Sequence, residues 1–195
     1  MHPILQAHFE THIKLSESAL SYLDGLFLEK TLKKKHYLLQ EGEINQGVAF
    51  VIDGLLRSYK VDANGFEHVL QFAPAGWWMA DMMSYNQQTP AELFIEALEP
   101  TTYLFITKQK MEEAFLQIPQ LERHFRILAE NAVIAFQQRL ISNLSQPAIQ
   151  RFAGFCKLYP TLIQSLPHKQ IASFIGVTPE FFSKMINNNP IPKVD

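Results

Sequence analysis

Four glycines divide residues 28–107 at nearly equal intervals, and this spacing constrains the fold more than any other feature of the chain. Gly42, Gly54, Gly65 and Gly76 lie twelve, eleven and eleven residues apart. The segments around them are short and rich in β-branched and aromatic residues. Short strands with such even punctuation are typical of an all-β sandwich or barrel. The stretch DANG, residues 62–65, predicts a hairpin turn, because Asn and Gly tolerate positive φ.

Helical periodicity replaces this pattern on both sides. Apolar positions within residues 4–25 indicate one or two N-terminal helices. After residue 108 the sequence predicts a short helix that ends near Pro119 and a long helix over 120–144. A further helix is expected over 147–159, with proline at its start. The chain is therefore expected to be an α+β protein with helices following its β-region.

One apolar stripe of the long helix predicts a contact surface. Its members follow a 4-3-4-3-4 spacing and are Leu121, Phe125, Leu128, Ala132, Ala135 and Arg139, with Phe136, Leu140 and Leu144 beside them. A stripe of this kind can pack on the chain's own β-region or form the seam between two helices of a dimer. Its length of about three heptads favours the dimer seam, so the sequence predicts a homodimer.

The stretch HKQIASFIGVTPEFFSKM, residues 168–185, predicts two short helices joined by a tight corner. Gly176 can adopt the positive φ that the corner demands, and Ala172 is small enough for a close helix crossing. Thr178 can cap the second helix, and Pro179 suits its first position. This combination is typical of a helix-turn-helix, whose second helix enters the major groove of DNA. The alternative is an ordinary helical corner.

The outer face of the second helix carries groups that can form hydrogen bonds with bases and phosphates. Glu180 can accept a hydrogen bond from a cytosine amino group, and Lys184 can donate to guanine. Hydroxyl groups, the helix N-terminus and nearby cations can hold phosphates. The partner predicted is double-stranded DNA, bound by two copies because cations are sparse. The candidate DNA-contacting residues are Thr178, Glu180, Ser183, Lys184, Lys169 and His168.

Charge and cysteine content narrow the function classes. Residues 1–107 carry seven Lys and Arg against thirteen Asp and Glu, whereas residues 108–195 carry ten against six. The basic second part is compatible with nucleic acid. The single Cys156 excludes an internal disulfide and a cysteine-held iron–sulfur cluster. With no membrane-length apolar run and no signal-peptide pattern, we expect a cytoplasmic protein with no membrane partner.

The whole order resembles the Crp/Fnr transcriptional regulators. The resemblance is carried by EGE at 41–43, FVIDGLLRSY at 50–59, the Ala75-Gly76 turn and the helix-turn-helix at 171–185. It implies a cyclic-nucleotide-binding-like β-roll or jelly roll, a dimerisation helix and a winged-helix-like DNA-binding domain with a truncated wing. The implied division is a sensor over 1–118, a dimerisation helix over 119–145 and a DNA-binding domain over 146–195.

The same resemblance implies a small-molecule effector in the β-roll, a near-palindromic DNA site and RNA polymerase as a further partner. It aligns Asp81 with the acid that meets a cyclic nucleotide's ribose. Ala91 and Glu92 stand where the phosphate-binding Arg and its neighbour would be. A carboxylate beside an anionic phosphate is electrostatically unfavourable, so we expect no tight binding of cyclic AMP or GMP. The implied pocket residues are Trp77, Trp78, Asp81, Ala91 and Glu92, and the effector is unknown.

Two other functions are weighed against DNA binding. A cupin-like metalloenzyme would need several metal ligands, but the β-region holds only His36 and His68. His8 and His12 have helical i, i+4 spacing, yet exposed helix histidines are the expectation there, so we predict no metal and no enzyme. A regulator that acts by protein contact without DNA is the second alternative, because the residues after Met185 leave no room for a wing.

Overall fold

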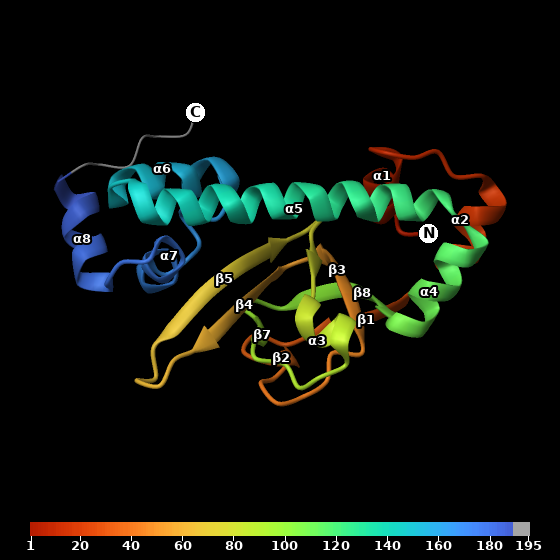
Figure 1. Ribbon diagram of the computed structural model, residues 1–195, viewed down its shortest axis with the longest axis horizontal. Coiled ribbons are helices and arrows are strands. Elements are labelled where there is room, and N and C mark those ends of the chain that lie inside the picture. Colours follow the sequence, from red (N-terminus) through yellow and green to blue (C-terminus); the bar gives the residue numbers. More distant parts are fainter. Residues whose placement is uncertain (189–195) are drawn as a thin grey trace. The chain divides into compact units, whose positions relative to one another are not determined.

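The structure is a computed structural model that describes residues 1–188 (Figure 1). It is an α+β chain with two antiparallel four-stranded sheets, as the glycine spacing and the helical periodicity predict. One sheet has the order β1-β8-β3-β6 and the other the order β2-β7-β4-β5. The strands are β1 (Leu28–Leu32), β2 (Tyr37–Leu39), β3 (Gly47–Asp53), β4 (Leu55–Val61), β5 (Glu67–Pro74), β6 (Trp78–Met79), β7 (Phe94–Ala97) and β8 (Thr101–Thr107). The helices are α1 (Pro3–Glu10), α2 (Glu17–Asp24), α3 (Met82–Gln87), α4 (Lys108–Gln117), α5 (Gln120–Ser145), α6 (Ala148–Leu158), α7 (His168–Ile175) and α8 (Pro179–Asn188).

The predicted glycine turns adopt the conformation that the spacing argument requires. Gly54 has a φ of 90°, and a Cβ added there would lie 2.5 Å from the carbonyl oxygen of Pro100. At the tip of the β4–β5 hairpin, the Asp62 carboxylate accepts hydrogen bonds from the amides of Asn64 and Phe66, at 2.8 and 3.0 Å. An Asp side chain that bonds its own turn in this way favours the chain reversal.

The space between the two sheets is filled by apolar side chains. The cluster draws residues from strands of both sheets, which makes it the interior of the β-roll. Its buried members are Leu39, Val51, Leu56, Ala73, Met79, Ala91, Ile95 and Ala97.

A second cluster joins the N-terminal helices to the start of the long helix. Leu5 and Phe9 of α1 pack with Phe50 of β3 and Leu121 of α5, and all four are essentially fully buried. Ser16 caps α2 by accepting a hydrogen bond from the amide of Ala19 at 3.2 Å. The burial of α1 explains why residues 1–25 form helices although each helix is only eight residues long.

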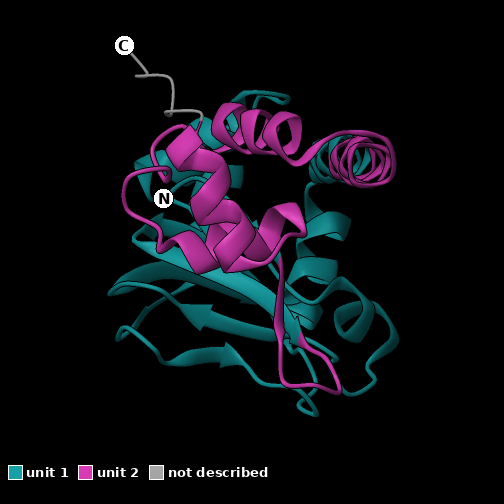
Figure 2. Cartoon of the chain, turned by 90° about the vertical axis from the view of Figure 1, so that its left-hand side faces the viewer, with its two compact units in different colours: residues 1–60, 70–131 teal, residues 61–69, 132–195 magenta. Residues whose placement is uncertain are grey.

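The chain forms two compact units, shown in Figure 2. The first comprises residues 1–60 and 70–131, and the second comprises the hairpin tip 61–69 with residues 132–195. The division falls inside α5, so this helix contributes to both units. The truncated wing expected after the helix-turn-helix lies outside the described residues. No helix within residues 1–188 has the length and apolar content needed to cross a membrane.

Candidate nucleic-acid interface

The predicted corner between α7 and α8 is formed as expected. Gly176 lies in the left-handed region, with φ 71° and ψ 45°, and its amide donates to the carbonyl groups of Ala172 and Ser173. Thr178 accepts a hydrogen bond from the amide of Phe181 at 3.2 Å through its hydroxyl, which caps α8. Glycine suits this position because the residue that ends α7 is left-handed, and α8 is capped only two residues later.

The two helices bury one face each against the other helices of the second unit. The buried face comprises Ile171, Ala172, Ile175, Phe182 and Met185. The Phe182 ring lies 5.2 Å from that of Phe152 on α6, in an edge-to-face arrangement. These contacts hold one face of α8 against α6 and leave its other face exposed.

The opposite face of α8 is exposed and mostly polar. Thr178, Glu180, Lys184 and Asn187 are exposed, and Ser183 is partly buried. Lys184 is the only cation between residues 178 and 188 of the described chain. His168 and Lys169 are exposed at the N-terminus of α7, with the His168 ring 5.5 Å from that of Phe182. All six predicted DNA-contacting residues therefore belong to the α7–α8 motif and have solvent access.

Ser173 and Arg139 attach the hairpin tip to α7, and sequence reasoning missed both roles. The Ser173 hydroxyl donates to the carbonyl of Glu67 at 2.6 Å and accepts from the amide of Val69 at 2.9 Å. Arg139 of α5 donates to the carbonyls of Val69 and Phe174, both at 2.8 Å, and lies 3.9 Å over the Phe174 ring. The sequence signal for Arg139 is its position as the cation that ends the otherwise apolar stripe of α5.

The predicted ligand-pocket residues are divided between the roll interior and its surface. Ala91 is buried in the apolar cluster of the roll, and Trp77 packs against that cluster. Glu92 is exposed and forms an ion pair with Lys60, which raises the pKa of the lysine mainly through their hydrogen bond. Trp78 contacts Phe50 and Phe125, with ring centres 4.9 and 5.2 Å away.

Asp81 has a structural partner at the start of α3. Its side chain is buried and accepts a hydrogen bond from the amide of Ser84 at 3.0 Å, which makes it the N-cap of this helix. Its other carboxylate oxygen is buried without a hydrogen-bond partner among the described residues. The Asp81, Ala91 and Glu92 side chains thus do not form a cationic pocket for a phosphate.

His8 and His12 differ from the expectation of exposed helix histidines. Both are partly buried, and His12 lies beyond the end of α1. Nδ1 of each faces a different ring nitrogen of the fully buried His124, at 3.2 Å. Burial first, and then the charges of His8 and His12, lower the pKa of His124 to about 4. The sequence signal for His124 is its position between Leu121 and Phe125 in an apolar stripe of α5.

This three-histidine chain is a hydrogen-bonded structural cluster. Each bond requires one ring to donate and the other to accept, so both ring nitrogens of His124 are paired when the three imidazoles are neutral. Among residues 1–188, no group of three or more His, Cys, Asp or Glu is arranged to hold a metal ion.

The stripe of α5 that the sequence assigned to a dimer seam is partly used inside the chain. Leu121 is fully buried in the core of the first unit, and Phe125 packs on the same cluster. Leu128 is partly buried, whereas Ala132 and Ala135 are exposed. Burial of Leu121 leaves it unavailable to a second copy.

A second stripe of α5 carries large apolar side chains that are half or more exposed, and it includes the three residues that the sequence placed beside the predicted seam. Its centre lies roughly 140° around the helix axis from that seam, at about 100° per residue. Exposed apolar residues in such a row mark an interaction surface. We call this row the α5 stripe, and its members are Val133, Ile134, Phe136, Leu140, Ile141 and Leu144.

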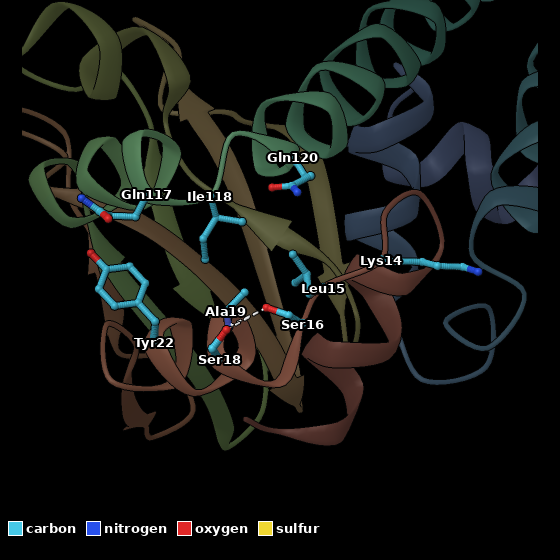
Figure 3. Close-up of a pocket in the computed structure, with 9 residues that line it drawn as sticks. All are labelled: Lys14, Leu15, Ser16, Ser18, Ala19, Tyr22, Gln117, Ile118 and Gln120. Atoms are coloured by element: carbon cyan, nitrogen blue, oxygen red, sulfur yellow. Dashed lines mark hydrogen bonds between the residues drawn. The ribbon is translucent and has the colours of Figure 1, made fainter.

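A surface hollow of ≈ 460 Å³ lies between α2 and the α4–α5 connection (Figure 3). Polar groups line most of it, including those of Ser16, Tyr22 and Gln117. Lys14 is directed away from Tyr22, so its ammonium group does not converge with the other polar groups on one point (Figure 3). None of the residues assigned to the sensor pocket from the sequence lines this hollow.

Comparison with known proteins agrees with this architecture. Residues 29–117 match the family described as "Cyclic nucleotide-binding domain". The fumarate and nitrate reduction regulatory protein of Vibrio cholerae is 22% identical over 184 residues, which cover 88% of this chain and 73% of that protein. These matches agree with the resemblance to the Crp/Fnr regulators that the sequence shows. The nitrogen fixation regulation protein FixK of Rhizobium meliloti is 24% identical over 171 residues, covering 84% of this chain and 76% of that protein.

The fold of the chain is also that of a solved structure. FixK2 from Bradyrhizobium japonicum superimposes with a TM-score of 0.72 at 19% identity, covering 83% of each chain. The relatives are named as regulators and not as enzymes, which agrees with the prediction from the sequence.

Proposed function

We propose that this protein is a transcriptional regulator that binds a near-palindromic DNA site as a homodimer through α8. The observation that supports the proposal most is the α7–α8 corner, in which Gly176 and the Thr178 cap present a rigid helix with an exposed polar face. A helix held in this way by a helix-turn-helix inserts its N-terminal half into the major groove. Such a regulator acts on DNA in the cytoplasm.

The exposed side chains of α8 include a hydrogen-bond acceptor and a hydrogen-bond donor that suit different base edges. Glu180 is an acceptor for the cytosine amino group, and Lys184 donates to guanine O6 and N7. Lysine lacks the bidentate fork of arginine, so its contact with guanine has weaker geometric selectivity. Thr178, His168 and Lys169 lie at the N-termini of α8 and α7, and Ser183 lies one turn further along α8, so each is proposed to contact a phosphate.

A second copy would supply the affinity that one recognition helix lacks. Specific binding draws much of its free energy from phosphate neutralisation, and α8 contributes one lysine. The α5 stripe offers the contact surface for dimerisation, because its exposed side chains recur with the spacing of a helix–helix seam. Two copies related by a two-fold axis would read two half-sites of a palindrome.

Selection of bound fragments from the source genome tests the proposal. We expect recovery of fragments that share an inverted repeat with half-sites about one helical turn apart, and binding that weakens steeply as salt rises. Recovery of no enriched sequence, or binding that ignores salt concentration, would contradict DNA recognition and would favour a regulator that works by protein contact.

The sensor is proposed to respond to a ligand other than cyclic AMP or GMP. The roll interior is packed with apolar side chains, and the acidic Glu92 is already paired with Lys60 at the phosphate position. Calorimetry with cyclic AMP and cyclic GMP should therefore show no binding at micromolar concentrations. Heat of binding with micromolar affinity for either nucleotide would refute this part of the proposal.

A further inference from the structure

The recognition helix carries an aromatic ring that neither the fold nor the proposed hydrogen-bonding contacts use. Phe181 is 53% exposed, whereas its neighbour Phe182 is 1% exposed and packs against Phe152 and His168. No ring contact or cation–π contact involves Phe181 among the pairs recorded for residues 1–188. Exposure of a phenyl ring to water is unfavourable, so contact of this ring with a partner would be favourable.

The position of Phe181 places it with the groups proposed to contact bases. It follows Glu180 directly and precedes Lys184 by three residues, so Phe181 and Lys184 are neighbours on the helix surface. The Thr178 cap bonds the amide of Phe181 itself, which fixes the backbone from which the ring projects. The first two turns of α8, the part that a helix-turn-helix directs at base edges, therefore present a carboxylate, a phenyl ring and an ammonium group together.

The chemistry of the major groove identifies what an apolar ring can recognise there. Three of the four bases present only donors and acceptors in this groove, whereas thymine also presents its C5-methyl group. Contact between a phenyl ring and this methyl group removes apolar surface of both from water.

We infer that Phe181 is a specificity-determining residue that recognises a thymine through its C5-methyl group. The spacing of Phe181 and Lys184, about 4.5 Å along the helix, puts this thymine about one or two base pairs from the pair that Lys184 contacts. Each half-site thus combines a G·C pair with a neighbouring A·T pair. The inference rests on the proposed DNA-binding function.

The test uses the full chain and a duplex taken from the selected fragments. Each thymine of the half-sites is replaced in turn by deoxyuridine, which removes only the methyl group and keeps base pairing. Equilibrium binding is measured by fluorescence anisotropy. At one position per half-site, we expect the replacement to weaken binding of the wild-type protein about threefold to fourfold, the factor that corresponds to one buried methyl group.

Variants separate this contact from general effects on affinity. Phe181→Ala should bind the thymine and deoxyuridine duplexes equally, whereas Phe181→Leu should keep a preference for thymine. Lys184→Ala should weaken binding of both duplexes and leave their ratio unchanged. Circular dichroism checks that each variant keeps its helical content.

Two results would overturn the inference while leaving DNA binding intact. One is equal affinity of the wild-type protein for every thymine and deoxyuridine pair of duplexes. The other is a thymine preference that survives in Phe181→Ala. Absence of salt-sensitive binding to any selected DNA would overturn the proposed function and this inference together.

Discussion

His124 shows how a single residue couples the core of the first unit to pH. It is fully buried, and its two ring nitrogens face those of His8 and His12. Its ring also packs 5.0 Å from that of Phe9 and 5.5 Å from that of Phe125. A proton added here would place a charge among aromatic rings and two other imidazoles, which explains the direction of its pKa shift.

Stability should therefore fall on acidification, and His124→Phe should weaken this dependence. The pKa of His124 is lowered from 6.5 to about 4 in the folded chain. Between these values the unfolded chain binds a proton that the folded chain does not, so the contribution is complete above pH 6.5 and is lost as pH falls toward 4. Melting temperatures measured from pH 7 to pH 4 should drop more steeply for the wild type than for His124→Phe.

The exposed His36 provides a control for this measurement. His36→Phe removes a histidine from the surface and should keep the wild-type slope of melting temperature against pH. Parallel curves for the wild type and His124→Phe would show that the buried histidine does not carry the pH dependence.

At the scale of an element, the α7–α8 corner was predictable, whereas the partner that covers each apolar face of α5 was not. The corner depends on local chemistry, namely Gly176, the Thr178 cap and Pro179, and such signals survive in the sequence. The stripe around Leu121 and Phe125 is also visible in the sequence. However, periodicity gives the apolar face and not the partner that covers it, so the sequence could not distinguish the chain's own core from a second copy.

Two glycine substitutions should change stability in opposite directions. Gly176→Ala should destabilise the fold by about 1–2 kcal/mol, because the residue has a φ of 71° and an L side chain is strained there. Gly154 lies inside α6, and a Cβ added there would meet no atom within 4 Å. Gly154→Ala should therefore stabilise the fold by about 0.5–1 kcal/mol. Denaturant unfolding of both variants checks the signs, and equal effects would contradict the role of Gly176.

The oligomeric state of two α5 variants should identify the face that forms the dimer. Leu140 lies in the α5 stripe, and the exposed Ala135 belongs to the seam expected from the sequence. Leu140→Asp should give a monomer by light scattering, because a carboxylate would be buried in an apolar seam. Ala135→Asp should remain dimeric. The reverse outcome would return the interface to the seam that the sequence indicated.

At the scale of the whole molecule, the order of elements was readable because each part has its own periodicity. The evenly spaced glycines predicted the β-region, and the helical segments after residue 108 followed from their apolar spacing. Long-range side-chain pairs gave no comparable signal. Folding brings together residues that are far apart in the sequence: Arg57 donates a hydrogen bond to Glu96, and Ser173 accepts one from the amide of Val69. The interior of the β-roll likewise depends on long-range packing, since Ala91 is buried among apolar side chains from several strands.

Equilibrium binding to a selected duplex at several salt concentrations tests the central claim, that α8 contacts DNA bases, most directly. Lys184→Ala should weaken binding by about 1–3 kcal/mol and relax the preference at one base pair of each half-site. Lys157→Ala removes an exposed cation from α6 and should keep the wild-type base preference. If Lys184→Ala binds with the affinity and base preference of the wild type, α8 is not the recognition helix and the account is contradicted.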